Sequence, residues 1–434
     1  MTLGTVVTRG AIAVAVALST VALPSALPGF SDGFPGIDGV GPAVARAGHS
    51  AEKYRLPGSG RFQLSGLGFG HGIGMSQFGA EGMGELGKSY EQIVKFYYPG
   101  TSFAKARAGR QIRVLLSGVV RSDFGHSAVL VRPKPGLRVV NAGRRIELPS
   151  RVAGHRVTGY RVQRTPSAMQ VRAYNGSTSR RVAAGLTGTV RFATASAPIK
   201  SRITLVAAAG NERRYRGFLD VRKSDSGLMA MSNVRLEDYL RSVVSTEVPS
   251  SWTNAALRAQ AVAARSYAML AQLSSRKAGR AYDICDTTTC QVYGPIRAES
   301  KRESDAVHAT SRRYLRSGGK PALTMFSSAN GGYTVAGSRK YLVAKKDPYD
   351  GVVTGAANWG HSWQTTVSGS TLANAWPQVG RVKALKVCQR DGNGRWGGRV
   401  LRVAIIGSHG TARVSADSFR WGLGLKSAWW TVTN

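Results

Sequence analysis

Short hydrophobic runs separated by turn residues fill the chain from residue 102 to about residue 233. Runs of this length and spacing are typical of β-strands. The same pattern, with Gly-rich turns, returns after residue 312. The clearest strand candidates lie at 112–116, 128–131, 203–206, 382–388 and 400–406.

Helical spacing of the apolar positions occurs between these two strand-rich stretches. It predicts helices over 236–247 and 253–273, and Pro249 separates them. The second helix is rich in alanine, which permits close packing against a neighbour. A shorter amphipathic helix is predicted over 90–98, before Pro99. The predicted fold class is α+β, a strand-rich single unit with a central helical pair.

The amino terminus has the pattern of an export signal. Arg9 precedes an apolar stretch, 11–23, that is shorter than the roughly 20 residues of a membrane-spanning helix. Small-residue cleavage patterns occur at 43–45 and 45–47. We therefore interpret residues 1–47 as a signal peptide with a propeptide-like linker, and an uncleaved anchor is the alternative. The expected location is secreted or in the cell wall.

The rest of the chain divides by composition into three parts. Residues 48–101 form a Gly-rich segment, of which 48–61 is polar and is predicted to be a linker. Residues 102–233 form a β-rich region, and residues 234–434 form the core that carries the helical pair. A length of 434 residues with 42% hydrophobic content can bury a sizeable core.

Charge is the most unusual feature of the composition. The chain has 60 Lys plus Arg and 23 Asp plus Glu, a formal net charge of +37. Such an excess favours a polyanionic partner. The basic residues are scattered along the chain, and no nucleic-acid motif is present. Together with the export signal, this disfavours nucleic acid and favours anionic polymers of the cell wall.

The Gly-rich segment contains one misleading match and one candidate site. Residues 82–89 satisfy the P-loop expression, but no apolar strand precedes them, so we do not predict nucleotide binding. Residues 68–77 alternate glycine with other residues, which lets the backbone approach a ligand or a strand closely. His71, Ser76 and Gln77 are polar side chains suited to lining a site.

Glu247 is the strongest candidate for an acid catalyst. Pro249 ends the first helix, which places Glu247 at the negative end of the helix dipole. Val244, Val248 and Trp252 are close enough in sequence to remove it from water. Both effects raise the pKa of a carboxyl group, as a general acid requires. The alternative is a solvated glutamate at a helix end.

Three polar residues interrupt the alanine-rich helix. They are Arg258, Gln260 and Arg265, and the two arginines share one face. This face either lines a site or is solvated. Elsewhere, Cys285 and Cys290 bracket a short loop that can close as a disulfide, which leaves Cys388 unpaired.

Six segments together resemble a known family. They lie at 68–80, 236–240, 247–249, 256–267, 285–293 and 327–334. They look like the SpoIID/LytB family of bacterial cell-wall remodelling, over most of residues 62–434. The resemblance implies a lytic transglycosylase, which cuts peptidoglycan glycan strands between N-acetylmuramic acid and N-acetylglucosamine and leaves a 1,6-anhydro product. It equally allows the role of the LytB type, a non-catalytic enhancer of a wall amidase.

The resemblance also assigns roles to individual residues. Glu247 matches the proposed catalytic acid/base. The expected substrate-binding residues are His71, Ser76, Gln77, Arg258, Gln260, Arg265, Ser327, Ser328 and Asn330. Some relatives bind zinc through a histidine between the two cysteines, but this chain has Thr289 there. We therefore expect a disulfide or free thiols at Cys285 and Cys290, and no cofactor.

One departure from the family concerns chain order. The Gly-His-Gly motif usually closes the domain, whereas here it opens the chain after the signal. This predicts a circular permutation in which residues 62–101 dock beside residue 434. A rival interpretation is an ordinary two-carboxylate glycosidase with Asp283 or Asp286 as its second acid.

Overall fold

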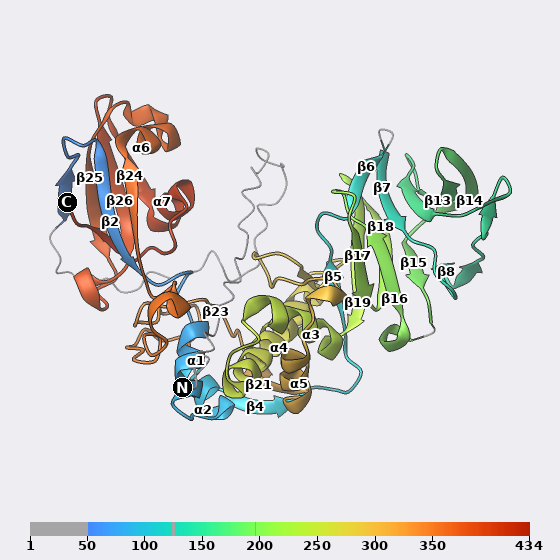
Figure 1. The fold of residues 1–434 in the computed structure, drawn as a ribbon, viewed down its shortest axis with the longest axis horizontal. Coiled ribbons are helices and arrows are strands. Elements are labelled where there is room, and N and C mark those ends of the chain that lie inside the picture. The colour runs from blue at the N-terminus through green and yellow to red at the C-terminus, as the bar shows by residue number, and fades with distance from the viewer. Residues whose placement is uncertain (1–50, 124–125, 196) are drawn as a thin grey trace, which may run out of the picture. The chain divides into compact units, whose positions relative to one another are not determined.

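The computed structural model describes residues 51–123, 126–195 and 197–434 (Figure 1). The predicted signal peptide and its cleavage patterns lie outside these residues. Within them, helices and strands are mixed as expected for the α+β class. No helix of the described ranges is long and apolar enough to cross a membrane.

Most strands of two seven-stranded sheets come from the stretch 102–233, in which the sequence indicated short strands. One has the order β20-β5-β19-β18-β15-β8-β9, and the other has the order β14-β13-β12-β7-β16-β17 with β6 beside β7. The strands of the first are β5 (Gln111–Leu115), β8 (Arg138–Asn141), β9 (Arg144–Ile146), β15 (Thr189–Ala193), β18 (Phe218–Ser224), β19 (Gly227–Arg235) and β20 (Ile284–Cys285). Those of the second are β6 (Val120–Asp123), β7 (His126–Val131), β12 (Gly159–Arg164), β13 (Met169–Asn175), β14 (Thr178–Leu186), β16 (Arg202–Val206) and β17 (Glu212–Arg216).

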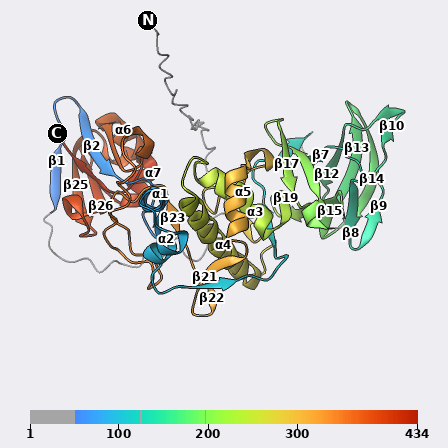
Figure 2. The ribbon, with the colours of Figure 1, turned by 60° about the horizontal axis from the view of Figure 1, so that its bottom comes forward.

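The predicted helical pair is present, with α3 at Leu236–Glu247 and α4 at Asn254–Lys277. Thr253 caps α4 by accepting a hydrogen bond from the backbone of Ala256. Fully buried alanines along α4 let neighbouring elements approach closely. Figure 2 shows α4 beside α3 and α5 (Lys301–Ala309). Helices α1 (Gln77–Glu85) and α2 (Tyr90–Tyr97) and strand β21 (Arg313–Ser317) also pack on α4.

The carboxyl-terminal part contains two smaller sheets around one hydrophobic core. Their orders are β1-β25-β26-β27 and β24-β2-β28, and α6 and α7 complete the core. The elements are β1 (Glu52–Arg55), β2 (Arg61–Leu67), β24 (Ser362–Ser368), α6 (Gly369–Ala375), β25 (Val382–Arg390), β26 (Val400–Gly407), β27 (Thr411–Ser415), α7 (Ala416–Leu423) and β28 (Trp430–Val432). The strands predicted near 382–388 and 400–406 are therefore confirmed as β25 and β26.

The predicted linker over 48–61 is wrong where it overlaps β1. This strand pairs with β25, and the Glu52 carboxylate forms an ion pair with the buried Arg390 at 2.7 Å. Its sequence, Glu-Lys-Tyr-Arg, has almost no apolar signal because β1 is an edge strand with one solvated face. An ion pair and main-chain pairing hold it in place of apolar burial.

The two ends of the described chain lie side by side, as predicted. β2 pairs with β28, and the Asn434 side chain accepts a hydrogen bond from the backbone of Gln63 at 2.9 Å. The Gly-rich segment thus enters the fold next to the carboxyl terminus. Circular permutation as the origin of this arrangement remains a prediction.

A fully buried carboxylate joins the Gly-rich segment to the rest of the fold. Asp350 accepts hydrogen bonds from the Ser76 hydroxyl at 2.5 Å and from the Asn330 amide at 2.8 Å. Its second oxygen accepts from the Gly331 amide at 2.9 Å and lies 2.6 Å from His361 Nδ1. All the acceptor positions of Asp350 are therefore used inside the protein.

Asp347 adds a second buried anchor three residues earlier. It accepts a hydrogen bond from the Tyr97 hydroxyl at 2.7 Å and one from the Asn330 side-chain amide at 2.6 Å. Burial raises the pKa of Asp347, and nearby Asp350 adds to the effect. Tyr97 belongs to α2, so this contact fixes the far end of the Gly-rich segment.

We expect Asp350→Asn to destabilise the protein by about 3 to 5 kcal/mol, because it leaves several buried groups without their charged partner. Urea unfolding at neutral pH measures this loss. Asp305→Asn is the matched control, since Asp305 is exposed and pairs only with exposed Lys301. Its cost should stay below about 1 kcal/mol. Equal, small losses in both variants would contradict the role of Asp350 as an anchor.

Candidate active site

The glycines of the 68–77 motif allow it to lie directly against another segment. Gly70 has φ of 109°, and a Cβ atom there would lie 2.6 Å from the Ser327 Cβ. Gly74 has φ of 71°, and a Cβ there would lie 2.2 Å from the Met325 carbonyl oxygen. Both positions therefore require glycine. Strand β3 (Met75–Ser76) then pairs in parallel with β23 (Phe326–Ser327).

Helix α1 begins immediately after this motif and directs Gln77 at Glu247. Ser76 caps the helix by accepting a hydrogen bond from the Gly79 amide at 3.0 Å. Gln77 is its first residue and is buried, and its Nε2 donates to Glu247 Oε2 at 3.4 Å. The structure thus brings together two predicted site residues that are 170 positions apart.

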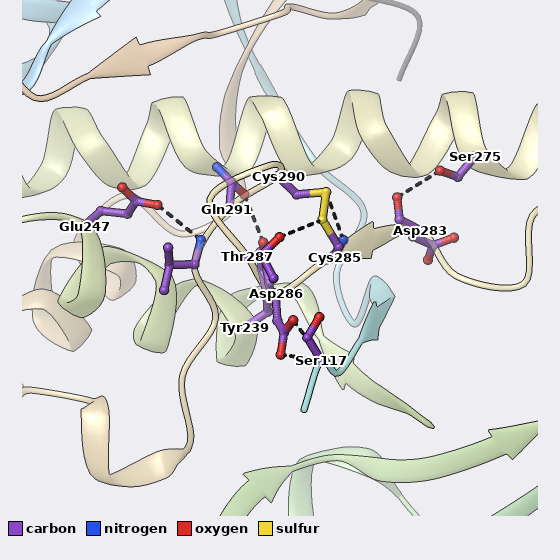
Figure 3. Close-up of a disulfide and its surroundings, with 11 residues drawn as sticks. Ser117, Tyr239, Glu247, Ser275, Asp283, Cys285, Asp286, Thr287, Cys290 and Gln291 are labelled. Carbon is purple, nitrogen blue, oxygen red and sulfur yellow. Dashed lines mark hydrogen bonds between the residues drawn. A yellow bond between two sulfur atoms is a disulfide. The ribbon is translucent and has the colours of Figure 1, made fainter. Parts of the chain in front are cut away.

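Glu247 ends α3, as predicted, and its carboxylate is held from two sides. The backbone amide of Val292 donates to Oε1 at 3.3 Å, opposite the contact from Gln77. Figure 3 shows this carboxylate beside the loop that connects Cys285 with Gln291, under α4. Both bonds are longer than the usual 2.9 to 3.0 Å, so they hold the carboxylate weakly.

The pKa of Glu247 is raised to about 7, because burial disfavours its charged form. The bonds from Val292 and Gln77 lower the pKa in part. Among the described residues, no Lys, Arg or His lies within 4.0 Å ion-pair distance of this carboxylate, despite the large basic excess. Near neutral pH the group can therefore both donate and accept a proton.

One face of α4 closes the site on the other side. Tyr267 belongs to this face; burial, and then the charge of Glu247, raise its pKa to about 12. Gln291 joins α3 to the same face, since it accepts from the Tyr239 hydroxyl at 3.0 Å and donates to the Ala264 carbonyl at 3.4 Å. Gln260 precedes Ala264 by one turn and shares this face.

Gln260 is fully buried, yet neither atom of its side-chain amide has a hydrogen-bond partner among the described residues. Unpaired buried amides are rare and costly. Both amide atoms are also closed off from solvent, so Gln260 presents no surface to a ligand in this structure, and its substrate-binding role stays a prediction.

Three other predicted substrate-binding residues have internal roles, and we reassign them. Arg265 is 0% exposed, forms a 2.7 Å ion pair with Glu237 and donates to the Arg313 carbonyl at 3.0 Å. Ser327 Oγ accepts from the Gly72 amide at 3.2 Å, and Asn330 serves Asp347 and Asp350. These residues position the segments around the site, and buried Arg265 and Asn330 have no surface for a ligand.

The remaining predicted residues stay at least partly accessible. His71 is exposed, and its Nδ1 accepts from the Ile73 amide at 2.9 Å, which leaves Nε2 to carry the proton of a neutral ring. Arg258 is half-buried on α4. Ser328 is half-buried, and its carbonyl accepts from the Phe78 amide at 3.0 Å.

Cys285 and Cys290 form a disulfide, which is one of the two predicted alternatives (Figure 3). The Cα atoms are 5.5 Å apart, and the closed loop leads into Gln291 and Val292, which contact the site. The sulfurs bond to each other, and the ranges that the structure describes hold no group of three or more His, Cys, Asp or Glu suited to a metal. The residues at this position therefore do not fit the zinc site of some relatives.

Neither candidate for a second catalytic carboxylate faces Glu247. Asp283 is buried between Arg113 at 2.7 Å and Arg276 at 3.2 Å. Burial alone would raise its pKa, but the hydrogen bonds from the arginines outweigh it and the pKa is lowered. Asp286 accepts from the Ser117 amide at 3.0 Å and is directed at it in Figure 3. Both carboxylates are committed to structural contacts.

Sequence reasoning missed the acids that hold the site together. Glu81 accepts hydrogen bonds from the amide and the hydroxyl of Thr253, both at 2.8 Å, and so ties α1 to the start of α4. Asp347, Asp350 and His361 were missed as well. One signal was available, because two acids three residues apart are conspicuous in a chain with only 23 of them.

Comparisons with known proteins match parts of this chain. The model of the stage II sporulation protein family, SpoIID, matches residues 224–316. An amidase enhancer of Bacillus subtilis is 40% identical over 117 residues, which cover 26% of this chain and 15% of that protein. Stage II sporulation protein D of the same organism is 56% identical over 41 residues, 9% of this chain and 12% of that protein. An uncharacterized protein of Brachyspira hyodysenteriae is 32% identical over 143 residues, 33% of this chain and 38% of that protein. The chain thus spans much less than two thirds of each relative.

We expect the double variant Cys285→Ser/Cys290→Ser to lose about 2 kcal/mol of stability, as calculated for opening a short closed loop. Denaturant unfolding of both proteins, without reductant, measures the difference. Cys388→Ser is the control, because Cys388 is a free cysteine. It should change stability by less than about 1 kcal/mol. A double variant as stable as the control would show that the disulfide does not constrain this loop.

We expect Glu247→Gln to stabilise the protein relative to wild type at high pH. Because the pKa of Glu247 is higher in the folded protein than in the unfolded chain, wild type has its full free energy of unfolding below pH 4.5. It loses part of that free energy as the pH rises from 4.5 to about 7. The gain of the variant should grow over this window, to at most about 3 kcal/mol, and then stay constant. Unfolding free energies from pH 4 to 8 test this, with exposed Glu85→Gln as the control. Parallel stability curves for Glu247→Gln and wild type would contradict the raised pKa.

Proposed function

This chain belongs to the SpoIID/LytB family, and on that basis we propose that it is an exported cell-wall protein that cleaves peptidoglycan glycan strands. The proposed activity is that of a lytic transglycosylase, acting between N-acetylmuramic acid and N-acetylglucosamine. The observation that carries the proposal is the state of Glu247, a half-buried carboxyl group with a pKa of about 7 and no cationic partner among the described residues.

In the proposed mechanism Glu247 acts first as acid and then as base. Its proton passes to the glycosidic oxygen as the bond to the anomeric carbon breaks through an oxocarbenium-like state. The resulting carboxylate takes the proton of the muramic acid 6-hydroxyl, whose oxygen closes on the same anomeric carbon. The products are a 1,6-anhydro ring and a free 4-hydroxyl group, and Glu247 is protonated again.

An intramolecular nucleophile removes the need for a second carboxylate. A single-carboxylate mechanism agrees with the contacts of the other two acids, because Asp283 forms ion pairs with two arginines and Asp286 accepts a hydrogen bond from Ser117. Gln77 and the Val292 amide would hold the charged form of Glu247 in place between the two proton transfers.

The basic charge supports a wall location through anionic polymers. Residues 120–216 contain 19 Lys plus Arg and 3 Asp plus Glu, so the excess is concentrated in the β-rich region more than the overall sequence suggested. Phosphate-bearing and carboxylate-bearing wall polymers would be attracted to such a region. This attraction should weaken as salt is added.

A second candidate function comes from the relative named amidase enhancer. In that role the chain would bind the wall and stimulate an amidase without turnover of its own. The two functions differ in their dependence on Glu247, because an enhancer needs no proton transfer.

We expect wild type to release 1,6-anhydro-muramic products from purified sacculi, and Glu247→Gln to release them at least about 100-fold more slowly. Mass spectrometry of digests, with and without stem peptides, measures the products. Glu85→Gln is the matched control, because Glu85 is exposed on α1 and, among the described residues, forms no hydrogen bond with Glu247 or Gln77.

Full activity of Glu247→Gln would overturn the catalytic role. The enhancer function predicts a different result. Neither protein would then yield anhydro products, and both would stimulate an added amidase equally.

A further inference from the structure

An exposed indole packs against α1, the helix that carries Gln77. Trp359 is 50% exposed, which is unusual for so large an apolar side chain. Its ring meets Phe69 at a centroid distance of 5.0 Å and Phe78 at 6.4 Å, both in edge-to-face geometry. These two rings and Lys426, which lies over the indole ring, cover part of it, and half of the side chain stays open to solvent.

Aromatic contacts connect this indole with the first turn of α1, which also carries Gln77. Phe78 follows Gln77, which donates to the Glu247 carboxylate. The ring of Phe78 lies 5.2 Å from that of Trp252, which is buried and comes five residues after Glu247. Trp359 thus packs against the same short segment of α1 that supplies a hydrogen bond to the candidate catalytic group.

The backbone around Trp359 is fixed from both sides. Lys426 Nζ donates to the Trp359 carbonyl at 2.9 Å and lies 5.2 Å from the ring centroid. A Cβ atom on the next residue, Gly360, would lie 3.2 Å from the Ala329 Cβ. His361 follows and is bound to the Asp350 carboxylate. Fixing a half-exposed indole in this way contributes little to folding, since much of its apolar surface stays in water.

We propose that Trp359 is a stacking platform for a pyranose ring of the glycan strand, at a subsite beside the bond that Glu247 cleaves. The apolar C–H face of a pyranose matches the flat face of an indole, and the Lys426 ammonium at its side can bind the oxygens of the same sugar. This inference rests on the proposed function, since it takes peptidoglycan glycan as the ligand.

The size of the exposed surface favours a sugar over a protein partner. Half of one aromatic side chain offers on the order of 100 Å², whereas a stable protein interface buries about 800 Å² on each partner. A single pyranose face is of the right size.

Trp421 provides a matched control within the same chain. It is 71% exposed on α7, and the Arg420 guanidinium lies 4.5 Å from its ring centroid. It thus resembles Trp359 in exposure and in having a neighbouring cation. Within the described ranges it makes no ring contact with Phe69, Phe78 or Trp252.

The test measures binding of soluble glycan strands, freed of stem peptides, to the full chain carrying Glu247→Gln, which binds without turnover. Isothermal titration should show affinity reduced about tenfold or more by Trp359→Ala and less by Trp359→Phe, with no change for Trp421→Ala. Melting curves of each variant show that the fold is retained. Unchanged affinity in Trp359→Ala, or an equal loss in Trp421→Ala, would overturn the platform.

The activity assay of wild type separates this inference from the proposed function. If wild type releases anhydro products while Trp359→Ala binds glycan normally, the platform is wrong and the transglycosylase proposal stands. If wild type releases no product and the Glu247→Gln protein binds no glycan, both proposals fail.

Discussion

The buried carboxylate of Asp350 is the contact on which the candidate active site depends. It receives hydrogen bonds from Ser76, Asn330 and Gly331 and is paired with His361, so it joins segments that are far apart in the sequence. Ser76 is also the cap of α1, and the next residue is Gln77. The direction of the Gln77 side chain toward Glu247 therefore follows from a network whose centre has no contact with water. Such a network is strong only when every member is paired, which is the case here.

A contrast among the acidic residues supports the proposed role of Glu247. In a chain with 60 basic residues, Asp283 lies between two arginines and Glu237 pairs with buried Arg265. Asp350 has four hydrogen-bond partners. Glu247 has two long hydrogen bonds from neutral donors. Burial without a cation raises its pKa, whereas burial with cations lowers that of Asp283. Burial likewise raises the pKa of Glu81, Asp286 and Asp347, but short hydrogen bonds tie these three to structural partners, whereas the two bonds of Glu247 are long.

Close approach of backbone segments is the second constraint. The glycines of the 68–77 motif allow it to lie against residues 325–330, where a side chain at Gly70 or Gly74 would collide with Ser327 or Met325. Alanines serve the same purpose on α4, which is packed by α1, α2, α3 and α5. The site is thus formed where several elements come unusually near one another. Polar residues at this junction, such as Arg265 and Asn330, form hydrogen bonds with the neighbouring segments and hold them in place.

The sequence by itself determined the local features of this protein. Apolar spacing and Pro249 defined α3 and α4, the position of Glu247 at a helix end followed from them, and cysteine spacing allowed the disulfide. These features depend on residues that are neighbours along the chain. Only the tertiary structure decided that Arg265 faces Glu237 and not a ligand, that β1 is a strand, and that Asp347 and Asp350 are anchors. A seven-residue spacing shows which residues share a helix face, but what covers that face depends on other segments of the chain, here Glu237 at 28 positions and Arg313 at 48 positions from Arg265. The hydrogen bond between Gln77 and Glu247, which are 170 positions apart, was also decided by the tertiary structure, because packing and not local sequence brings the two residues together.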